Sequence, residues 1–430
     1  MKHLLSLCPF RLLPIRGGGA LRGFHLIRQL ARFYEVHAIL WQPEAELRAG
    51  AEGCRIPESV RVYSPQDQPP PRSWFHRLPH RLGPALQYRW LRRSWRGPAN
   101  SVLLNSHHLI QRILREHPIH AVVLDELDAV SCAPLVRRWA PGARRVFNSY
   151  NVNHRLMAQE LAALGQRPED NPDWRRVRWT EHNLRRFVDG VFACSELDRQ
   201  AFVACSGLPS YTVPNGVDTH FCQFDSRPEK AQSRTLLFTG SLQYPPNTDG
   251  LRFFLDEIWP RLKERMPGIE LLVIGAGAGP ALRGRLERTP QVRFAGEVPD
   301  LRPLACQAGV AVCPLRIGSG TRLKVLEYMS WGTPVVSTRK GVEGLEAEDG
   351  KHLLLADEPE PFVQAVLRLL NDRPLFDSMR HAARHFVEQR YDWDIIGNLA
   401  SRALKDLLQA PRWSSPGLNL SLPRSGSDHY

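Results

Sequence analysis

Short hydrophobic runs alternate with longer segments of helical periodicity along nearly the whole chain. The first half has apolar runs at 3–10, 36–41, 120–126, 144–149 and 190–195, and the second half at 235–240, 269–275, 292–297, 310–315 and 334–338. Amphipathic stretches such as 20–34 and 101–116 lie between them. Short apolar runs predict buried strands, and strands that alternate with helices predict parallel sheets joined by right-handed crossovers.

The length of 430 residues exceeds one hydrophobic core and suits two domains. The polar segment 226–233 separates the two halves of the pattern. We therefore expect two doubly wound, Rossmann-like α/β domains, an N-terminal one over 1–228 and a C-terminal one over 232–390. The helical segment 391–408 is expected to return to the N-terminal domain, and the Ser-, Pro- and Gly-rich tail 409–430 is expected to be disordered.

The chain is basic, with 57 Lys and Arg against 44 Asp and Glu, a net charge of +13. Such a charge points to anionic partners, namely phosphates, nucleic acid or an acidic membrane surface. No run approaches the roughly 18 apolar residues of a membrane span, so we do not expect an integral membrane protein. The apolar start of the chain superficially resembles a signal peptide, but Arg11 and Arg16 interrupt it. The eight cysteines show no CxxC or Cys/His ligand spacing, so we expect no zinc site or disulfide framework, only reduced thiols of a cytosolic protein.

Two glycine-rich turns follow predicted strands. Gly17, Gly18 and Gly19 precede a predicted helix, whose N-terminus would favour an anion, although a flexible turn explains them equally well. The second turn, GAGAG at 275–279, resembles a dinucleotide fingerprint, but its third glycine position is Pro280. A tight strand-to-helix turn is the better interpretation there.

The segment CPLRIGSGTRLKVLEYMSWGTPVVST at 313–338 is the strongest single signal. Backbone N–H groups at the predicted start of a helix come from four small residues, Gly318, Ser319, Gly320 and Thr321. Such groups preorganise a diphosphate site, to which Arg322 and Lys324 could add positive charge. Glu327 could accept hydrogen bonds from sugar hydroxyls. The alternatives are a solvated helix face for the two cations and a surface ion pair for Glu327.

Several motifs in fixed order carry a resemblance to a known family. The second half contains FTGSLQYPPNTDGL, IELLVIGAGAG, VRFAGEVPDL, GSGTRLKVLEYMSWGTPVVST and GVEGL with HLLLAD, and the first half contains PIRGGGALRGFHLIRQLA, FNSYNVNHRLM and VPNGVD. This series resembles family-4 glycosyltransferases with the GT-B fold, over roughly residues 1–408. The resemblance implies a nucleotide-sugar donor held in a cleft between two Rossmann-like domains, retention of anomeric configuration, no cofactor and no metal.

The resemblance also implies roles for particular residues. Glu327 corresponds to the second acid of the family's E-x7-E element and is expected on the ribose hydroxyls, whereas the position of the first acid is Ser319. The implied donor-binding positions are Gly17, Gly18, Gly19, Ser241, Asn247, Gly275, Val298, Ser319, Gly320, Thr321, Leu323 and Glu327.

Two departures from the family pattern concern catalysis. Many members carry an Arg and a Lys where this chain has Ser241 and Asn247, so we expect Arg322 and Lys324 to stabilise the leaving diphosphate instead. At a spacing of two residues these cations cannot share one helix face, and Lys324 is expected to be the one in the site.

The other departure lies in the N-terminal domain, where Tyr150 occupies the usual His position of the family. Either Tyr150 points into the cleft or His154 takes over, with a helix-surface histidine as the alternative for His154.

The stretch 72–96 is basic and aromatic, with seven arginines, three tryptophans and no acidic residue. On a helix over 86–96, four arginines share one arc, Arg89, Arg92, Arg93 and Arg96. This pattern favours a helix in an anionic membrane interface, with a solvated cover over the core and nucleic-acid binding as alternatives.

The sequence as a whole predicts a glycosyltransferase that moves a sugar from a nucleotide diphosphate sugar to a polysaccharide or lipid-linked acceptor, in the biosynthesis of cell-envelope polysaccharide. We expect it in the cytoplasm, peripheral to the inner face of the plasma membrane, without a nucleic-acid partner. The alternatives are a GT-B nucleotide-sugar epimerase, a catalytically inactive GT-B binding protein and, against the organised donor-domain motifs, a nucleic-acid binder.

Overall fold

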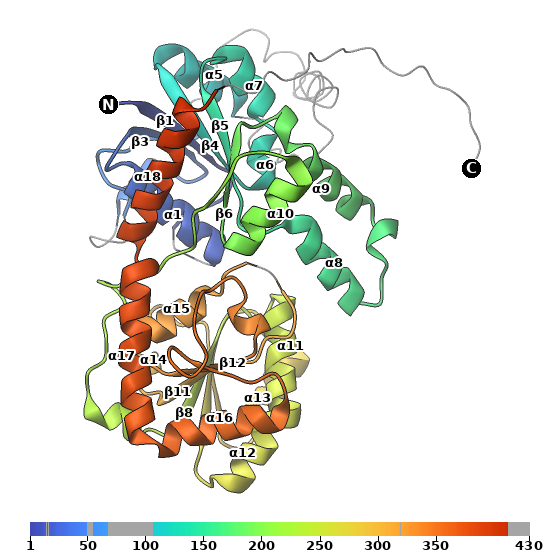
Figure 1. Cartoon of the computed structure of the whole chain (residues 1–430), viewed down its shortest axis with the longest axis vertical. Helices are drawn as coiled ribbons and strands as arrows, with labels where there is room; N and C mark the ends of the chain where they lie inside the picture. Colours follow the sequence, from blue (N-terminus) through green and yellow to red (C-terminus); the bar gives the residue numbers. More distant parts are fainter. Residues whose placement is uncertain (14, 16, 50–54, 68–105, 319, 412–430) are drawn as a thin grey trace, which may run out of the picture.

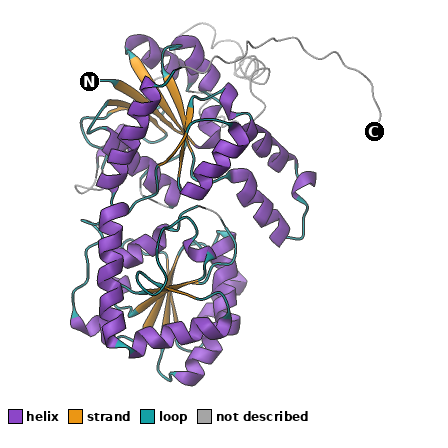
Figure 2. Cartoon of the chain, viewed as in Figure 1, coloured by secondary structure: helices purple, strands orange, loops and turns teal. Residues whose placement is uncertain are grey.

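The structure is a computed structural model of the chain that describes all residues except 14, 16, 50–54, 68–105, 319 and 412–430. Two α/β domains lie one above the other along the long axis of the molecule (Figure 1). In each of them a central sheet is flanked by helices on both faces (Figure 2). The predicted fold class, two Rossmann-like doubly wound domains, is confirmed.

The N-terminal sheet has seven strands in the order β3-β2-β1-β4-β5-β6-β7, and every pair of neighbours is parallel. The strands are β1 (His3–Cys8), β2 (Glu35–Leu40), β3 (Arg61–Tyr63), β4 (Ile119–Asp125), β5 (Arg144–Asn148), β6 (Gly190–Ala193) and β7 (Ser210–Thr212). The order of the strands reverses between β1 and β4. In open α/β sheets, ligands bind at the carboxyl ends of the strands beside such a reversal.

The C-terminal sheet has six parallel strands in the order β10-β9-β8-β11-β12-β13. They are β8 (Thr235–Thr239), β9 (Glu270–Ile274), β10 (Val292–Gly296), β11 (Val310–Cys313), β12 (Val335–Ser337) and β13 (Leu354–Leu355). The order reverses between β8 and β11, so this domain also has one switch point.

Helices cover both faces of the sheets. In the N-terminal domain they are α1 (Gly18–Leu30), α2 (Glu44–Arg48), α5 (His107–Glu116), α6 (Glu126–Val130), α7 (Ala133–Trp139), α8 (Asn153–Ala163), α9 (Pro172–His182) and α10 (Glu196–Ser206). In the C-terminal domain they are α11 (Pro245–Phe253), α12 (Trp259–Arg265), α13 (Pro280–Arg288), α14 (Arg302–Ala305), α15 (Leu323–Ser330), α16 (Pro359–Asn371) and α17 (Arg373–Arg390). A π-helical turn, η5 (Phe254–Ile258), joins α11 to α12, and 3-10 turns lie at η2 (Pro168–Asp170), η3 (Leu184–Arg186), η4 (Pro228–Gln232) and η6 (Lys340–Val342).

The central strands are buried on both faces, which explains their continuous apolar runs. Leu4, Leu5 and Leu7 of β1 are inaccessible to solvent although successive side chains point to opposite faces of the sheet. The sequence pattern located ten strands and missed β3, β7 and β13. These three lie at sheet edges and have two or three residues each, too few to give a periodic signal.

Within the described residues the final helix is α18 (Trp393–Gln409), which leaves the C-terminal domain and packs on α1 of the N-terminal domain (Figure 1). Ile396, Ala400 and Leu404 of α18 belong to the same buried cluster as Phe24 and Ile27 of α1. One side of the N-terminal core is therefore built by the end of the chain.

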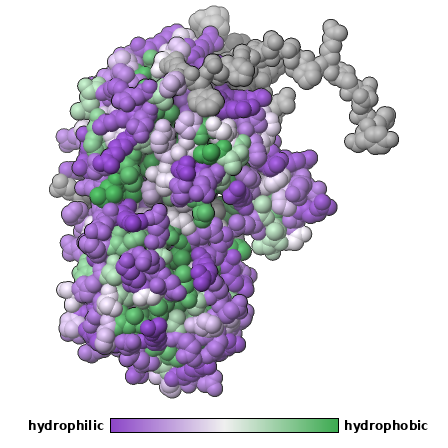
Figure 3. Space-filling view, in the orientation of Figure 1, coloured by the Kyte–Doolittle hydropathy of each residue, from purple (hydrophilic) through white to green (hydrophobic). Residues whose placement is uncertain are grey.

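Hydrophilic residues predominate on the face of the molecule drawn in Figure 3, and hydrophobic residues form scattered patches on it. Within the described residues, no helix combines the length and apolar character needed to cross a bilayer. The seven cysteines in this part of the chain are free, and five of them are buried. The basic stretch 72–96 and nearly all of the tail 409–430 lie outside the described residues.

Candidate functional site

The switch points of the two sheets face each other across the domain boundary. Loops that follow β5 and β7 in the N-terminal domain meet the loop that follows β11 in the C-terminal domain. Asn215 Nδ2 donates a hydrogen bond to Thr321 Oγ1 at 2.7 Å. The backbone N–H of Gly318 donates to Gln159 Oε1 at 3.0 Å. The glycine-containing loop predicted to bind phosphate is thus held between the two domains.

The side chain of Lys324, from α15, reaches the end of β8 at the switch point of the C-terminal sheet. Its Nζ donates a hydrogen bond to Asn247 Oδ1 at 2.8 Å and lies 4.5 Å from the centroid of the Phe238 ring. Burial, together with the nearby Arg322 guanidinium, lowers the pKa of the Lys324 amine to about 8, while Glu327 acts in the opposite direction. The amine is therefore a cation at neutral pH whose charge is poorly solvated.

Arg322 lies outside the helix, contrary to the spacing argument made from the sequence. Helix α15 begins at Leu323, and Arg322 is its N-cap residue with an extended backbone (φ −88°, ψ 92°). The residue is 7% exposed, and its guanidinium lies beside Gly318. Because Arg322 precedes the helix, the helical spacing does not force the two cations apart: Arg322 is buried and Lys324 is partly buried.

Glu327 shares the partly exposed face of α15 with Leu323 and Lys324. Burial raises the pKa of its carboxyl group, and the Lys324 amine one turn earlier acts in the opposite direction. The rest of the helix is apolar and packed: Val325, Leu326 and the other core residues of α15 are buried. The packed face therefore fixes the direction in which Glu327 points.

The Gly17–Gly19 turn lies directly opposite α15. A Cβ atom on Gly18 would come within 3.0 Å of Leu323 Cδ1, and one on Gly19 would come within 3.0 Å of the Tyr150 ring. Gly17 has a φ of 112° and is the N-cap residue of α1, a conformation that favours glycine. The turn thus brings the N-terminus of α1 to the start of α15.

The other implied donor-binding positions lie in the turns after β8, β9 and β10. Ser241 is exposed, and its carbonyl accepts a hydrogen bond from Asn247 Nδ2 at 2.9 Å. A Cβ atom on Gly275 would fall 1.9 Å from the carbonyl oxygen of Gly240, so the two turns touch through their backbones. Val298 is partly buried beyond β10. Ser319 lies outside the described residues.

A cavity of about 570 Å³ opens beside these turns. It lies between the end of α8 and the starts of α11 and α13. Its wall includes Leu164, Gln243, Gly277 and Ile317. The cavity has the size of a small-molecule pocket and continues the donor-side turns toward the N-terminal domain.

A buried polar network that sequence reasoning missed fills the switch point of the N-terminal sheet. Arg22, 1% exposed, donates through Nε and Nη2 to Asn148 Oδ1 at 3.0 and 2.7 Å. Its Nη1 donates to the carbonyl oxygens of Val213 and Pro214 at 2.8 and 3.0 Å and to Asn215 Oδ1 at 3.1 Å. A single guanidinium therefore joins the first helix to the end of β5 and to the loop after β7.

Two consecutive carboxyl groups complete this network. Asp125 ends β4 and accepts hydrogen bonds from Asn148 Nδ2 at 2.5 Å and Tyr150 OH at 3.2 Å. Glu126 has a φ of 63°, unusual for a side chain of this size, and accepts from the Tyr150 N–H at 3.0 Å. Burial raises the pKa of Asp125 to about 6 and that of Glu126 to about 7. An acidic pair directly after a buried strand is the signal that could have located them.

Tyr150 and His154, the two alternatives of the sequence analysis, have different surroundings. Tyr150 packs on Gly19 and reaches Asp125 at the switch point. The Nδ1 of His154 pairs with the buried Glu181, which also accepts hydrogen bonds from the first two N–H groups of α8. With a side chain 14% exposed, His154 is not the surface histidine considered as its alternative.

Two Rossmann-like domains whose switch points face each other define the GT-B class of proteins. Residues 233–372 match the family of group 1 glycosyl transferases, so the resemblance indicated by the sequence motifs is confirmed. Over the whole chain, sucrose-phosphate synthase from Thermosynechococcus elongatus has the same fold, with a TM-score of 0.69, 15% identity and coverage of 95% of this chain and 99% of that one.

Two further proteins are similar to this chain. HepE of Anabaena in complex with UDP-glucose has a TM-score of 0.65 and 16% identity, and covers 94% of this chain and 100% of that one. The phosphatidyl-myo-inositol mannosyltransferase of Mycobacterium tuberculosis is 28% identical over 227 residues. This match spans 50% of the chain and 59% of that relative, which is less than two thirds of its length.

Proposed function

We propose that the protein is a retaining glycosyltransferase that moves a sugar from a nucleotide diphosphate sugar to a lipid-linked or polysaccharide acceptor. The observation that carries the proposal is the arrangement of Arg322, Lys324 and Glu327 at the C-terminal switch point, opposite the Gly17–Gly19 turn. This arrangement combines two cations, backbone N–H groups and one carboxylate within a single loop and helix start. These groups match the diphosphate and the ribose of a nucleotide sugar.

In this reaction the bond between the anomeric carbon and the diphosphate oxygen breaks, and the electron pair goes to the leaving nucleoside diphosphate. The acceptor hydroxyl oxygen forms the new bond to the anomeric carbon, and its proton passes to the leaving phosphate. Lys324 and Arg322 offset the negative charge that develops on the diphosphate oxygen. The partly buried position of Lys324 increases the strength of this interaction, because water screens it less than on the surface.

The donor side of the proposal is supported by the matched family and by the UDP-glucose complex of HepE, which has the same fold. The acceptor side is supported by the mannosyltransferase relative, whose name includes a phosphoinositide lipid. An envelope polysaccharide or a lipid-linked saccharide is therefore the acceptor class that we propose.

The first experiment is a thermal-shift screen of the protein against a panel of nucleotide sugars and free nucleotides. A ligand that binds only the folded state raises the melting temperature in proportion to the logarithm of its concentration over Kd. We expect at least one nucleoside diphosphate sugar to stabilise the protein more than the matching monophosphate does. The absence of any shift across the panel would overturn the proposal. Release of free nucleotide that depends on an added acceptor would then distinguish transfer from epimerisation.

Glu327→Ala is expected to weaken binding of the stabilising nucleotide by about 10-fold, since a carboxylate hydrogen-bonded to ribose hydroxyls contributes roughly 1.5 kcal/mol or more. Titration calorimetry measures the change directly. The matched control is Glu343→Ala. Glu343 is a partly buried carboxylate that pairs with Lys340, and its removal should leave the affinity for the nucleotide unchanged. Equal affinity of wild type and Glu327→Ala would remove Glu327 from the donor site.

We also propose that the stretch 72–96 binds an anionic membrane surface, on the basis of its seven arginines and three tryptophans. Replacement of Arg89, Arg92, Arg93 and Arg96 with Gln should strongly reduce cosedimentation with phosphatidylserine-containing vesicles. Binding of the wild type should fall as salt rises, because the attraction is screened. Equal binding of variant and wild type at low salt would contradict a membrane role.

A further inference from the structure

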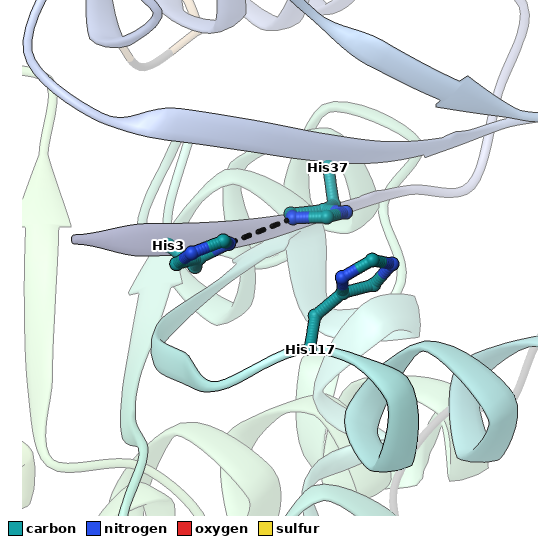
Figure 4. A group of neighbouring side chains, drawn as sticks. All are labelled: His3, His37 and His117. Atoms are coloured by element: carbon teal, nitrogen blue, oxygen red, sulfur yellow. Dashed lines mark hydrogen bonds between the residues drawn. The ribbon is translucent and has the colours of Figure 1, made fainter. Parts of the chain in front are cut away.

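Three histidines from separate elements converge near the amino ends of β1 and β2, at the end of the N-terminal sheet opposite the switch point. His3 begins β1, His37 lies in β2, and His117 follows α5 on the way to β4 (Figure 4). One ring nitrogen of each lies within 4.8 Å of a ring nitrogen of both others. These residues are 34 and 80 positions apart in sequence, so no ligand spacing could reveal the group.

The closest approach in this group has the spacing of two ligands on one ion. A hydrogen bond joins His3 Nδ1 and His37 Nε2 at 3.2 Å (Figure 4), and the His37 and His117 ring centroids are 4.3 Å apart. Two imidazole nitrogens bound tetrahedrally at about 2.0–2.1 Å from a zinc ion lie roughly 3.3 Å from each other.

The outward nitrogens of the two strand histidines already have the partners that metal-bound histidines use. His37 Nδ1 lies 3.0 Å from Tyr63 OH, which is also 3.3 Å from His117 Nε2. His3 Nε2 lies 3.5 Å from the Glu35 carboxylate. A hydrogen bond from the second nitrogen to an oxygen fixes the tautomer and the ring orientation of a ligating histidine.

We propose that His3, His37 and His117 form a binding site for one divalent transition-metal ion of the zinc type. Three neutral nitrogen donors suit zinc and its neighbours in the first transition row, in contrast to magnesium or calcium, which prefer oxygen. A bound ion would join β1, β2 and the α5–β4 connection at one point. The site lies at the other end of the sheet from the switch point, so its proposed role is structural and does not depend on glycosyl transfer.

The test uses untagged, chelator-treated full-length protein and measures Zn²⁺ affinity by competition with a chromophoric chelator. The wild type is expected to bind one Zn²⁺ with an affinity that falls about 10-fold or more in His117→Ala and in His3→Gln. Tyr63→Phe keeps the ring and removes the hydroxyl, and it should weaken binding by about 10–100-fold. Co²⁺ substituted into the wild type should give the visible absorption of a tetrahedral nitrogen-ligated ion.

His108→Ala is the matched control, because His108 is an exposed histidine of α5 whose ring lies 3.7 Å from that of His107. Its affinity should equal that of the wild type. Zn²⁺ binding that is lost in His108→Ala and kept in His117→Ala would place the ion on the surface pair and overturn the proposal. Absence of stoichiometric binding by the wild type, with neither Co²⁺ absorption nor a thermal shift, would overturn it as well. Circular dichroism of each variant separates a lost ligand from a lost fold.

Discussion

Lys324→Ala is expected to lower kcat by about 10²-fold or more under saturating donor, the usual effect of removing one preorganised contact to a developing negative charge. The reason is the position of Nζ at the end of β8, where it is held by Asn247 and the Phe238 ring. The leaving diphosphate carries more negative charge in the transition state than in the bound donor. The loss should therefore appear in kcat more than in the affinity for the donor.

Two variants control for this interpretation. Asn247→Ala removes the amide that holds Lys324, and it should cost clearly less than the loss of the cation, because a neutral hydrogen bond is weaker than an ionic one. Lys351→Ala removes an exposed lysine and should turn over like the wild type. If Lys324→Ala is fully active while Asn247→Ala is inactive, the cation at 324 does not compensate for the basic pair that the family usually carries.

The lowered pKa of Lys324 gives this prediction a second readout. An amine with a pKa of about 8 is charged below that pH and neutral above it. The kcat/KM of the wild type should therefore decline above about pH 8. The guanidinium of Lys324→Arg keeps its charge at every accessible pH. Whatever the absolute rate of this variant, its kcat/KM should not decline above about pH 8.

Arg22→Met is expected to lower the free energy of unfolding by about 3–5 kcal/mol, the range for removing one member of a buried charged network. The substitution leaves Asn148, Asn215 and two backbone carbonyls without their donor. It also removes the positive charge that offsets the burial of Asp125. Chemical denaturation followed by circular dichroism measures the loss.

Arg32→Met is the matched control for this substitution. Arg32 lies just after the same helix, is exposed, and pairs with Asp394 on the surface, an interaction worth about 0–1 kcal/mol. If Arg22→Met lowers the free energy of unfolding by no more than Arg32→Met does, the structural role assigned to the buried guanidinium is contradicted.

The sequence predicted the fold because the central strands are buried on both faces. Their apolar runs are continuous and stand out from the amphipathic helices between them. The alternation of strands and helices also indicated parallel, doubly wound sheets, whereas the order of the strands is seen only in the structure. The short edge strands could not be found in this way, since strands such as Leu354–Leu355 contribute almost no pattern.

The candidate site was predictable only where it is continuous in sequence. The residues from Gly318 to Glu327 lie in one loop and one helix, so their spacing alone brought them together. The partners of Arg22 are 126 to 193 positions away, and a basic residue inside an apolar helix gives no indication of what it will contact. The sequence analysis placed Arg322 inside the helix, whereas α15 begins one residue later. The exact start of a helix depends on tertiary contacts, which periodicity does not reveal.

The return of α18 to the N-terminal domain has a consequence for biosynthesis. Trp393, Ile396 and Leu404 fill a core whose other members include residues near the start of the chain. A ribosome delivers the first half of the protein long before those side chains exist, so the nascent N-terminal domain carries an uncovered apolar surface throughout translation of the second. Completion of the first domain must therefore wait for α18, and we expect the two domains to mature as one unit, with the apolar surface exposed to chaperones until α18 has been synthesised.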